Sequence, residues 1–265
     1  MGNILLHLLP ALLYATLAAA CLQNNKNRRA WTSALLLSAL LAHAWLLENI
    51  LFNQGDLHFG LSTALSLTLW LAMAIYALEA LVTPLNGLLK RASPIAAISC
   101  LLPLIITGHP QALVLTNWAF KAHIVVAMLA YSLFTLAVFH AIVLTAAEHE
   151  LHQPQIGAEQ DMPPLLTLDN ILFRLITTAF VFLTLTVGSG LFFSEKIFNK
   201  PLMLNHKTVF GIASWLLFAT LLVGRKTFGW RGKTATRWLL AGFIVLLLAY
   251  AGTRFVLEFL LGRSI

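Results

Sequence analysis

Two histidines stand at the start of long apolar segments, where they could hold a metal or carry a proton. His123 opens the run HIVVAMLAYSLF, and His206 opens HKTVFGIASWLLFATLLVG. The histidine ring titrates near neutrality, and its neutral nitrogen ligates metal ions and haem iron. A polar side chain is costly among apolar residues, so a histidine there is a candidate for function. Which chemistry applies depends on where these segments run.

The composition indicates an integral membrane protein. Of the 265 residues, 59% are hydrophobic and 10% are charged, whereas soluble domains have roughly 45–50% and 25%. A helix needs about 20 residues to cross a bilayer, and backbone groups in lipid must bond to one another, which favours helices. We therefore predict an all-α bundle of about eight transmembrane helices that forms a single domain over residues 1–265. The predicted spans are residues 4–22, 30–50, 60–82, 94–108, 123–147, 171–193, 206–224 and 238–261.

The basic residues predict the orientation of these helices. They give the chain a net charge of +7 but alternate between loops instead of covering one soluble face, so nucleic-acid binding is not expected. Cytoplasmic loops are rich in lysine and arginine, so the loops after the first, third and seventh spans are predicted to be cytoplasmic. Both termini then face outward. These loops contain Lys26, Arg28 and Arg29; Lys90 and Arg91; and Arg225, Lys226, Arg231, Lys233 and Arg237.

Two cytoplasmic loops have distinct compositions. Residues 148–170 form the one long polar loop, and Asp169 or Asn170 is expected to cap the helix that follows. The loop RKTFGWRGKTATRW interleaves basic residues with Phe228, Trp230 and Trp238. That pattern is typical of an interfacial belt in contact with anionic headgroups.

The predicted topology sorts the histidines by depth. His123 and His206 both lie at the outer boundary, and His58 precedes the third span on the same side. His140 follows His123 by 17 residues, or ~26 Å along a helix, so it is expected at the cytoplasmic interface. Proton-coupled transport is disfavoured, because the acids near the bilayer lie toward helix ends and paired helix breaks are missing. Those acids are Glu48, Glu79 and Glu258.

Haem ligation needs two histidines at one depth, apolar walls and cations for the propionates. His123 and His206 meet the depth requirement and are the predicted axial ligands of haem b, with His58 as a nearby or alternate ligand. The residues expected around the haem are Trp118 and Phe120 as walls and Lys207 and Arg254 as propionate contacts. An alternative stays open at this point, in which His123 and His206 are interfacial side chains bonded to headgroups or water.

Three stretches resemble the CcsA/CcmC cytochrome c assembly family. WAFKAHIVVAMLAYSLF is similar to the family helix with an outward-facing haem-ligating histidine followed by a tyrosine, here His123 and Tyr131. GDLHFGLSTALSLTLW is similar to an external stretch that leads into a membrane helix. The last third, from HKTVFGIASW through GWRG to the final helix, is similar in spacing to the end of family members. The resemblance is closest to the YpjD/HemX-like branch.

The resemblance implies a haem-handling protein of the bacterial cytoplasmic (inner) membrane. The tryptophan-rich haem platform of the family is replaced here by GSGLFFSEKIFNKPLMLNHK, which ends near His206. The chain is therefore expected not to be an enzyme by itself but to act with other membrane or periplasmic assembly proteins, which would attach haem to apocytochrome.

Two other functions remain open from the sequence. One is a cofactor-free regulatory or interaction protein that acts through its cytoplasmic loop, residues 148–170. The other is a b-type cytochrome that transfers electrons across the membrane, which would need a second haem at His43 or His140.

Overall fold

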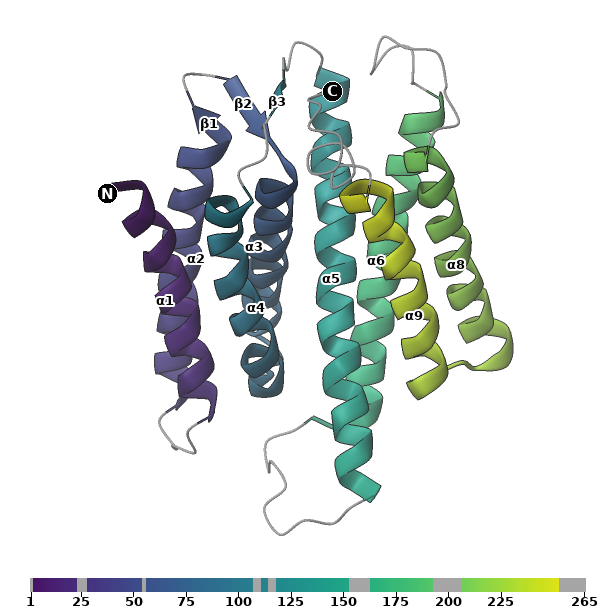
Figure 1. The fold of residues 1–265 in the computed structure, drawn as a ribbon. Coiled ribbons are helices and arrows are strands. Elements are labelled where there is room, and N and C mark those ends of the chain that lie inside the picture. The colour runs from purple at the N-terminus through teal and green to yellow at the C-terminus, as the bar shows by residue number, and fades with distance from the viewer. Residues whose placement is uncertain are drawn as a thin grey trace. The chain divides into compact units, whose positions relative to one another are not determined.

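A computed structural model describes residues 2–22, 28–53, 56–106, 111–113, 118–152, 163–192 and 206–252 (Figure 1). Within these ranges, eight helices are long and apolar enough to cross a membrane, which confirms the all-α membrane fold. The chain divides into two compact units. Unit 1 comprises Met1–Thr116 with Arg254–Ile265, and unit 2 comprises Asn117–Thr253. The single integral membrane domain over residues 1–265 and the outward termini stay predictions.

Unit 1 contains four helices in a closed ring. They are α1 (Gly2–Leu22), α2 (Arg28–Leu51), α3 (Leu61–Glu79) and α4 (Asn86–Ile105). Each packs on the next, and α4 packs back on α1. The turn between α3 and α4 is fixed by Tyr76, whose hydroxyl donates to the Leu85 carbonyl and accepts from the Leu85 N–H, both at 3.0 Å. The buried hydroxyl thereby gives the Leu85 N–H a partner, while the Leu85 carbonyl also accepts from the N–H groups of Leu88 and Leu89.

A small antiparallel sheet, which the sequence did not predict, lies at one end of unit 1. Its strands are β1 (Phe52–Asn53), β2 (Asp56–Phe59) and β3 (Gln111–Leu113), in the order β1-β2-β3. The register pairs Phe52 with Leu57, and Leu57 with Leu113. The sheet therefore joins the segment after α2 to the segment after α4.

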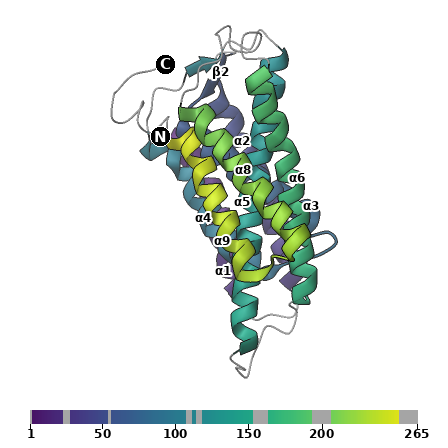
Figure 2. The ribbon, with the colours of Figure 1, turned by 90° about the vertical axis from the view of Figure 1, so that its right-hand side faces the viewer.

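Unit 2 is a second ring of four helices. They are α5 (Trp118–His152), α6 (Leu165–Phe192), α8 (His206–Phe228) and α9 (Gly232–Leu247), which continues as the π-helical turn η1 (Leu248–Gly252). Contacts connect α5 to α6, α6 to α8, α8 to α9 and α9 to α5. In both views α5 and α6 run side by side (Figure 1, Figure 2).

Aromatic rings fill the centre of unit 2. Phe134 of α5 and Phe218 of α8 stack at a centroid distance of 3.8 Å. A Cβ on Gly242 of α9 would lie 2.8 Å from Cε1 of Phe218. Glycine at this position therefore allows α9 to approach α8 closely. The start of α5, the end of α6 and the start of α8 lie at the same end of unit 2 (Figure 1).

The helix ends differ from several predicted boundaries. Helix α5 continues to His152 and α6 begins at Leu165, so both ends of the predicted loop 148–170 are helical. The prediction that Asp169 or Asn170 caps the sixth helix is wrong, because both lie inside α6. Pro163 and Pro164 precede this helix, and proline is favoured at a helix start because its fixed φ suits the first turn.

Candidate functional site

His123 lies at the end of unit 2 where α5 begins, five residues after the first residue of that helix. Its imidazole is partly buried, and Nδ1 is 2.8 Å from Oγ of Ser189 on α6. A Cβ built on the neighbouring Gly190 would lie 3.8 Å from Cε1 of the ring, an ordinary contact distance. Ser189 and Gly190 of α6 therefore lie alongside the imidazole, and the Ser189 hydroxyl contacts its Nδ1.

The second hydrogen bond of the Ser189 hydroxyl favours one tautomer of His123. Its Oγ donates to the Thr186 carbonyl at 3.0 Å, one turn back along α6. A hydroxyl has one hydrogen and two acceptor lone pairs, so toward His123 the serine oxygen accepts. Nδ1 of His123 is then the protonated nitrogen, and Nε2 carries the lone pair that can bind a metal.

The contact between α6 and α8 sets the level of His206. Trp215 donates from Nε1 to the Thr184 hydroxyl at 2.9 Å and stacks on Phe180 at 5.5 Å. Because α6 and α8 are antiparallel, five residues from this contact toward the end of unit 2 where α5 begins lead to Ser189 on α6 and to Phe210 on α8. His206, the exposed first residue of α8, lies four residues further in the same direction, or about 6 Å. It is therefore about one helical turn nearer to that end of unit 2 than Ser189, which contacts His123.

Tyr131 lies two turns deeper than His123 and connects α5 to α9. Its hydroxyl donates to the Leu246 carbonyl at 3.0 Å, and its ring meets Tyr250 edge-on at 6.4 Å. Leu246 lies two residues before the π-helical turn η1, where the ordinary i to i−4 pattern shifts. Tyr131 thus supports the backbone where α9 changes its winding.

The other predicted site residues are scattered. Trp118 is the first residue of α5 and is 79% exposed, and Lys207 is partly buried at the start of α8. His58 lies in unit 1, where its backbone pairs with Ala112 in the sheet, and its side chain lies outside the described part of the chain. Arg254 also falls outside the described residues. The structure thus brings His123 together with Ser189 and Gly190, two residues that the sequence analysis did not single out.

Two deeper histidines are enclosed by protein. His140 is 1% exposed, so the prediction that it is an interfacial side chain is wrong. Helix α5 extends twelve residues beyond it and packs on α6 and α9, which puts this level inside the bundle. His43 of unit 1 is 0% exposed, with Nε2 2.9 Å from Ser66 Oγ and Nδ1 3.4 Å from the Tyr14 hydroxyl.

A comparison with known protein families identifies the family of this chain. The model of the family described as Cytochrome C assembly protein matches residues 31–261, which is most of the chain. This chain belongs to the cytochrome c assembly protein family.

Individual relatives support the same assignment. The chain is 27% identical over 245 residues to inner membrane protein YpjD of Escherichia coli, covering 91% of this chain and 92% of YpjD. It is also 27% identical to an uncharacterised 28.8 kDa protein of Azospirillum brasilense over 97% of this chain and 96% of that protein. Cytochrome c biogenesis protein CcsA of Heterosigma akashiwo is 34% identical over 92 residues, 35% of this chain and 29% of CcsA. No solved structure matches the chain.

The likeness to YpjD and the eight membrane-capable helices make this family member a multi-pass protein of the inner membrane.

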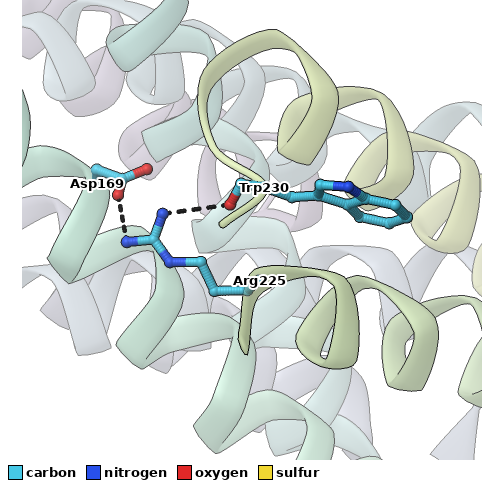
Figure 3. A network of polar contacts seen from close by, with 3 residues as sticks. All are labelled: Asp169, Arg225 and Trp230. Atoms are coloured by element: carbon cyan, nitrogen blue, oxygen red, sulfur yellow. Dashed lines mark hydrogen bonds and ion pairs between the residues drawn. The ribbon is translucent and has the colours of Figure 1, made fainter. Parts of the chain in front are cut away.

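At the end of unit 2 opposite His123, the protein contains a charge network that the sequence analysis missed (Figure 3). Arg225 of α8 donates from Nη2 to Oδ2 of the buried Asp169 at 2.6 Å and from Nη1 to the Trp230 carbonyl at 3.2 Å. Its guanidinium also lies 4.2 Å from the centroid of the Phe173 ring. This network ties α6, α8 and the turn before α9 together.

Proposed function

We propose that this protein binds haem b at the end of unit 2 where α5 begins and takes part in haem handling during cytochrome c-type biogenesis. The observation that carries the proposal is the chain of hydrogen bonds from His123 through Ser189 to the Thr186 carbonyl. Histidines that ligate metals typically donate their other ring N–H to a fixed acceptor, which orients the ring and sets the tautomer. In a cytochrome c assembly protein, an imidazole prepared in this way fits haem iron.

The surroundings of His123 suit a haem. The positions where a Cβ would stand on Gly188 and Gly211 have no heavy atom within 4 Å among the described residues, so bulky groups do not crowd these helix faces. Aromatic side chains of α5 and α8 offer apolar contacts, and Lys207 offers a cation for a propionate. Bound haem would supply the redox-active iron porphyrin that cytochrome c maturation consumes.

His206 is the proposed second ligand. His206 starts α8 at the same end of unit 2 as His123, so the two rings can approach the same ligand from different helices. We assign transfer of haem to apocytochrome to partner proteins in the membrane or periplasm. The role of this chain is then to hold haem at the membrane surface in a defined orientation.

The test is an absorption spectrum of the detergent-purified protein, oxidised and dithionite-reduced, with haem per chain quantified as the pyridine haemochrome. We expect a low-spin b-type spectrum with close to stoichiometric haem. His123→Ala should reduce haem content to background. His206→Ala should retain haem with a high-spin spectrum, because one axial ligand remains.

Two outcomes would contradict this proposal. Absence of haem after reconstitution with excess haemin would remove the haem-binding role. Spectra of His123→Ala that match those of the unmodified protein would show that another residue ligates the iron. His7→Ala is a suitable control, since His7 is also a buried histidine near a helix end, with Nδ1 2.7 Å from the Cys100 carbonyl oxygen in unit 1.

A further inference from the structure

The turn between α8 and α9 presents a basic and aromatic surface, here called the basic turn surface. Its exposed members are Lys226, Phe228, Arg231, Lys233 and Arg237. Phe228 is 76% exposed although it is large and apolar. The turn ends two helices that are apolar and long enough to cross a membrane, so the surface lies where a bilayer has its headgroups.

The backbone beneath this surface is firmly held. Trp230 donates its N–H to the Gly224 carbonyl at 3.3 Å, and its ring covers Gly224 so closely that a Cβ there would clash. Gly229 and Gly232 have φ of 67° and 55°, a conformation that other residues rarely adopt. Arg225 points inward from the turn, where it binds Asp169 and the Trp230 carbonyl (Figure 3).

The aromatic rings of the turn form a stacked row. Phe228 stacks on Trp230 at a centroid distance of 6.1 Å, and Trp230 stacks on Trp238 at 5.3 Å. Stacking restricts the rotation of these side chains and holds them beside the basic residues. Tryptophan and other aromatic rings favour the headgroup level because they combine an apolar body with polar contacts.

The acids described near this surface leave it basic. Asp169 is buried and bonded to Arg225, so this pair contributes no free charge to the turn. Glu148 of α5 has Oε1 2.7 Å from the position of a Cβ on Gly232, so it is an acid next to the start of α9. Four exposed cations, at positions 226, 231, 233 and 237, outnumber it.

We propose that the basic turn surface is a binding site for the headgroups of anionic phospholipids. The charge pattern supplies the attraction, the exposed Phe228 supplies apolar contact below the headgroup, and the Asp169–Arg225 network keeps the turn in shape. The site is separate from the haem proposal and does not depend on it. It gives unit 2 a fixed anchor in the leaflet at this end of the bundle.

Native mass spectrometry of the full chain in detergent tests this proposal. The protein is titrated with phosphatidylglycerol and, separately, with phosphatidylcholine, and the dissociation constants of retained lipid are compared. The test variant combines Arg231→Gln with Lys233→Gln. The control combines Lys90→Gln with Arg174→Gln, two exposed cations elsewhere, and has the same net charge. A third variant, Arg231→Lys with Lys233→Arg, keeps the charge of the surface.

We expect the preference for phosphatidylglycerol to fall by roughly five-fold for each cation removed from the surface. The control pair and the charge-conserving pair should keep the preference. An equal fall in the test and control pairs would mean that net charge alone attracts the lipid and would overturn the proposal. An unchanged preference in the test pair would also overturn the proposal. The basic turn surface would then be a candidate binding site for a protein partner instead. Circular dichroism confirms beforehand that all variants are folded.

Discussion

His43 of unit 1 and His123 of unit 2 are both histidines within membrane-capable helices, but their surroundings differ. His43 is fully buried, and its two nitrogens contact Ser66 of α3 and Tyr14 of α1. This one ring therefore connects three of the four helices of unit 1. His123 is partly exposed near the end of α5, and Ser189 of α6 engages its Nδ1 side.

Depth in the helix and residue type therefore do not by themselves identify a functional histidine. A ring whose two nitrogens are both bonded to protein, with no exposed edge, is a structural crosslink. A ring near a helix end that is oriented by a hydroxyl from a neighbouring helix resembles the arrangement typical of metal-ligating histidines. The environment of the ring, more than the apolar segment around it, separates these roles.

Of substitutions at the two histidines, His43→Ala should have the larger effect on stability. The substitution leaves a cavity and removes the bonding partners of Ser66 and Tyr14, so we expect a loss of about 2 kcal/mol in the free energy of unfolding. Haem content of the folded fraction should stay unchanged. Thermal unfolding in detergent, with haem quantified on the same samples, checks both parts.

His123→Ala should show the reverse pattern, with haem lost and stability reduced by less than about 1 kcal/mol, because its ring is partly exposed. If His43→Ala lost haem while still folded, the contrast between the two histidines would be invalid. His43 would then belong to the haem site.

The serines that contact the two histidines offer a matched pair of substitutions. Ser189→Ala removes the acceptor for Nδ1–H of His123, and loss of such a partner typically weakens metal binding about 10–100-fold. Ser66→Ala removes a partner of His43 and should leave haem affinity unchanged. Haemin titration followed by absorbance measures both affinities. Equal affinities for Ser189→Ala and the unmodified protein would mean that the hydroxyl does not orient the ligand.

The tautomer itself can be measured without haem. Nitrogen-15 chemical shifts of the His123 ring in haem-free protein should show protonated Nδ1, and Ser189→Ala should change the ratio of the tautomers. This readout separates the positioning role of Ser189 from the question of whether haem binds at all.

Much of the fold follows from the sequence because it depends on local composition. Long apolar runs must become helices in a bilayer, so the number of spans and their approximate limits were predictable. The residues at which the helices begin and end were less predictable. The α5 helix passes residue 147 and continues to His152, because the polar residues there still favour helix and Pro154 lies beyond them.

The contacts between helices could not be derived in the same way. His123 and Ser189 are 66 residues apart, and no periodic pattern indicates that their side chains meet. Asp169 looked like a helix cap because it follows a proline-rich loop, but it pairs with Arg225, 56 residues away. His140 was expected at the interface from its distance along the helix alone. Whether its side chain is enclosed depends on how α6 and α9 pack around α5, and this is a property of the tertiary structure.

The smallest expected effect concerns Gly190, which lies beside the His123 ring. A Cβ at this position would be 3.8 Å from Cε1, so Gly190→Ala adds an ordinary contact without displacing the ring. Alanine is also the better helix former, by up to about 1 kcal/mol. We expect unchanged haem affinity and equal or slightly higher thermal stability.

Gly224→Ala is the informative contrast, because a Cβ there would lie within the Trp230 ring and force the turn to move. It should reduce stability by about 1–3 kcal/mol. If Gly190→Ala instead lost haem while it remained as stable as the unmodified protein, the added methyl group would be occupying space that the haem needs. The haem would then lie on the Gly190 side of His123. Its second ligand would also have to come from that side of α5, and not from the far side.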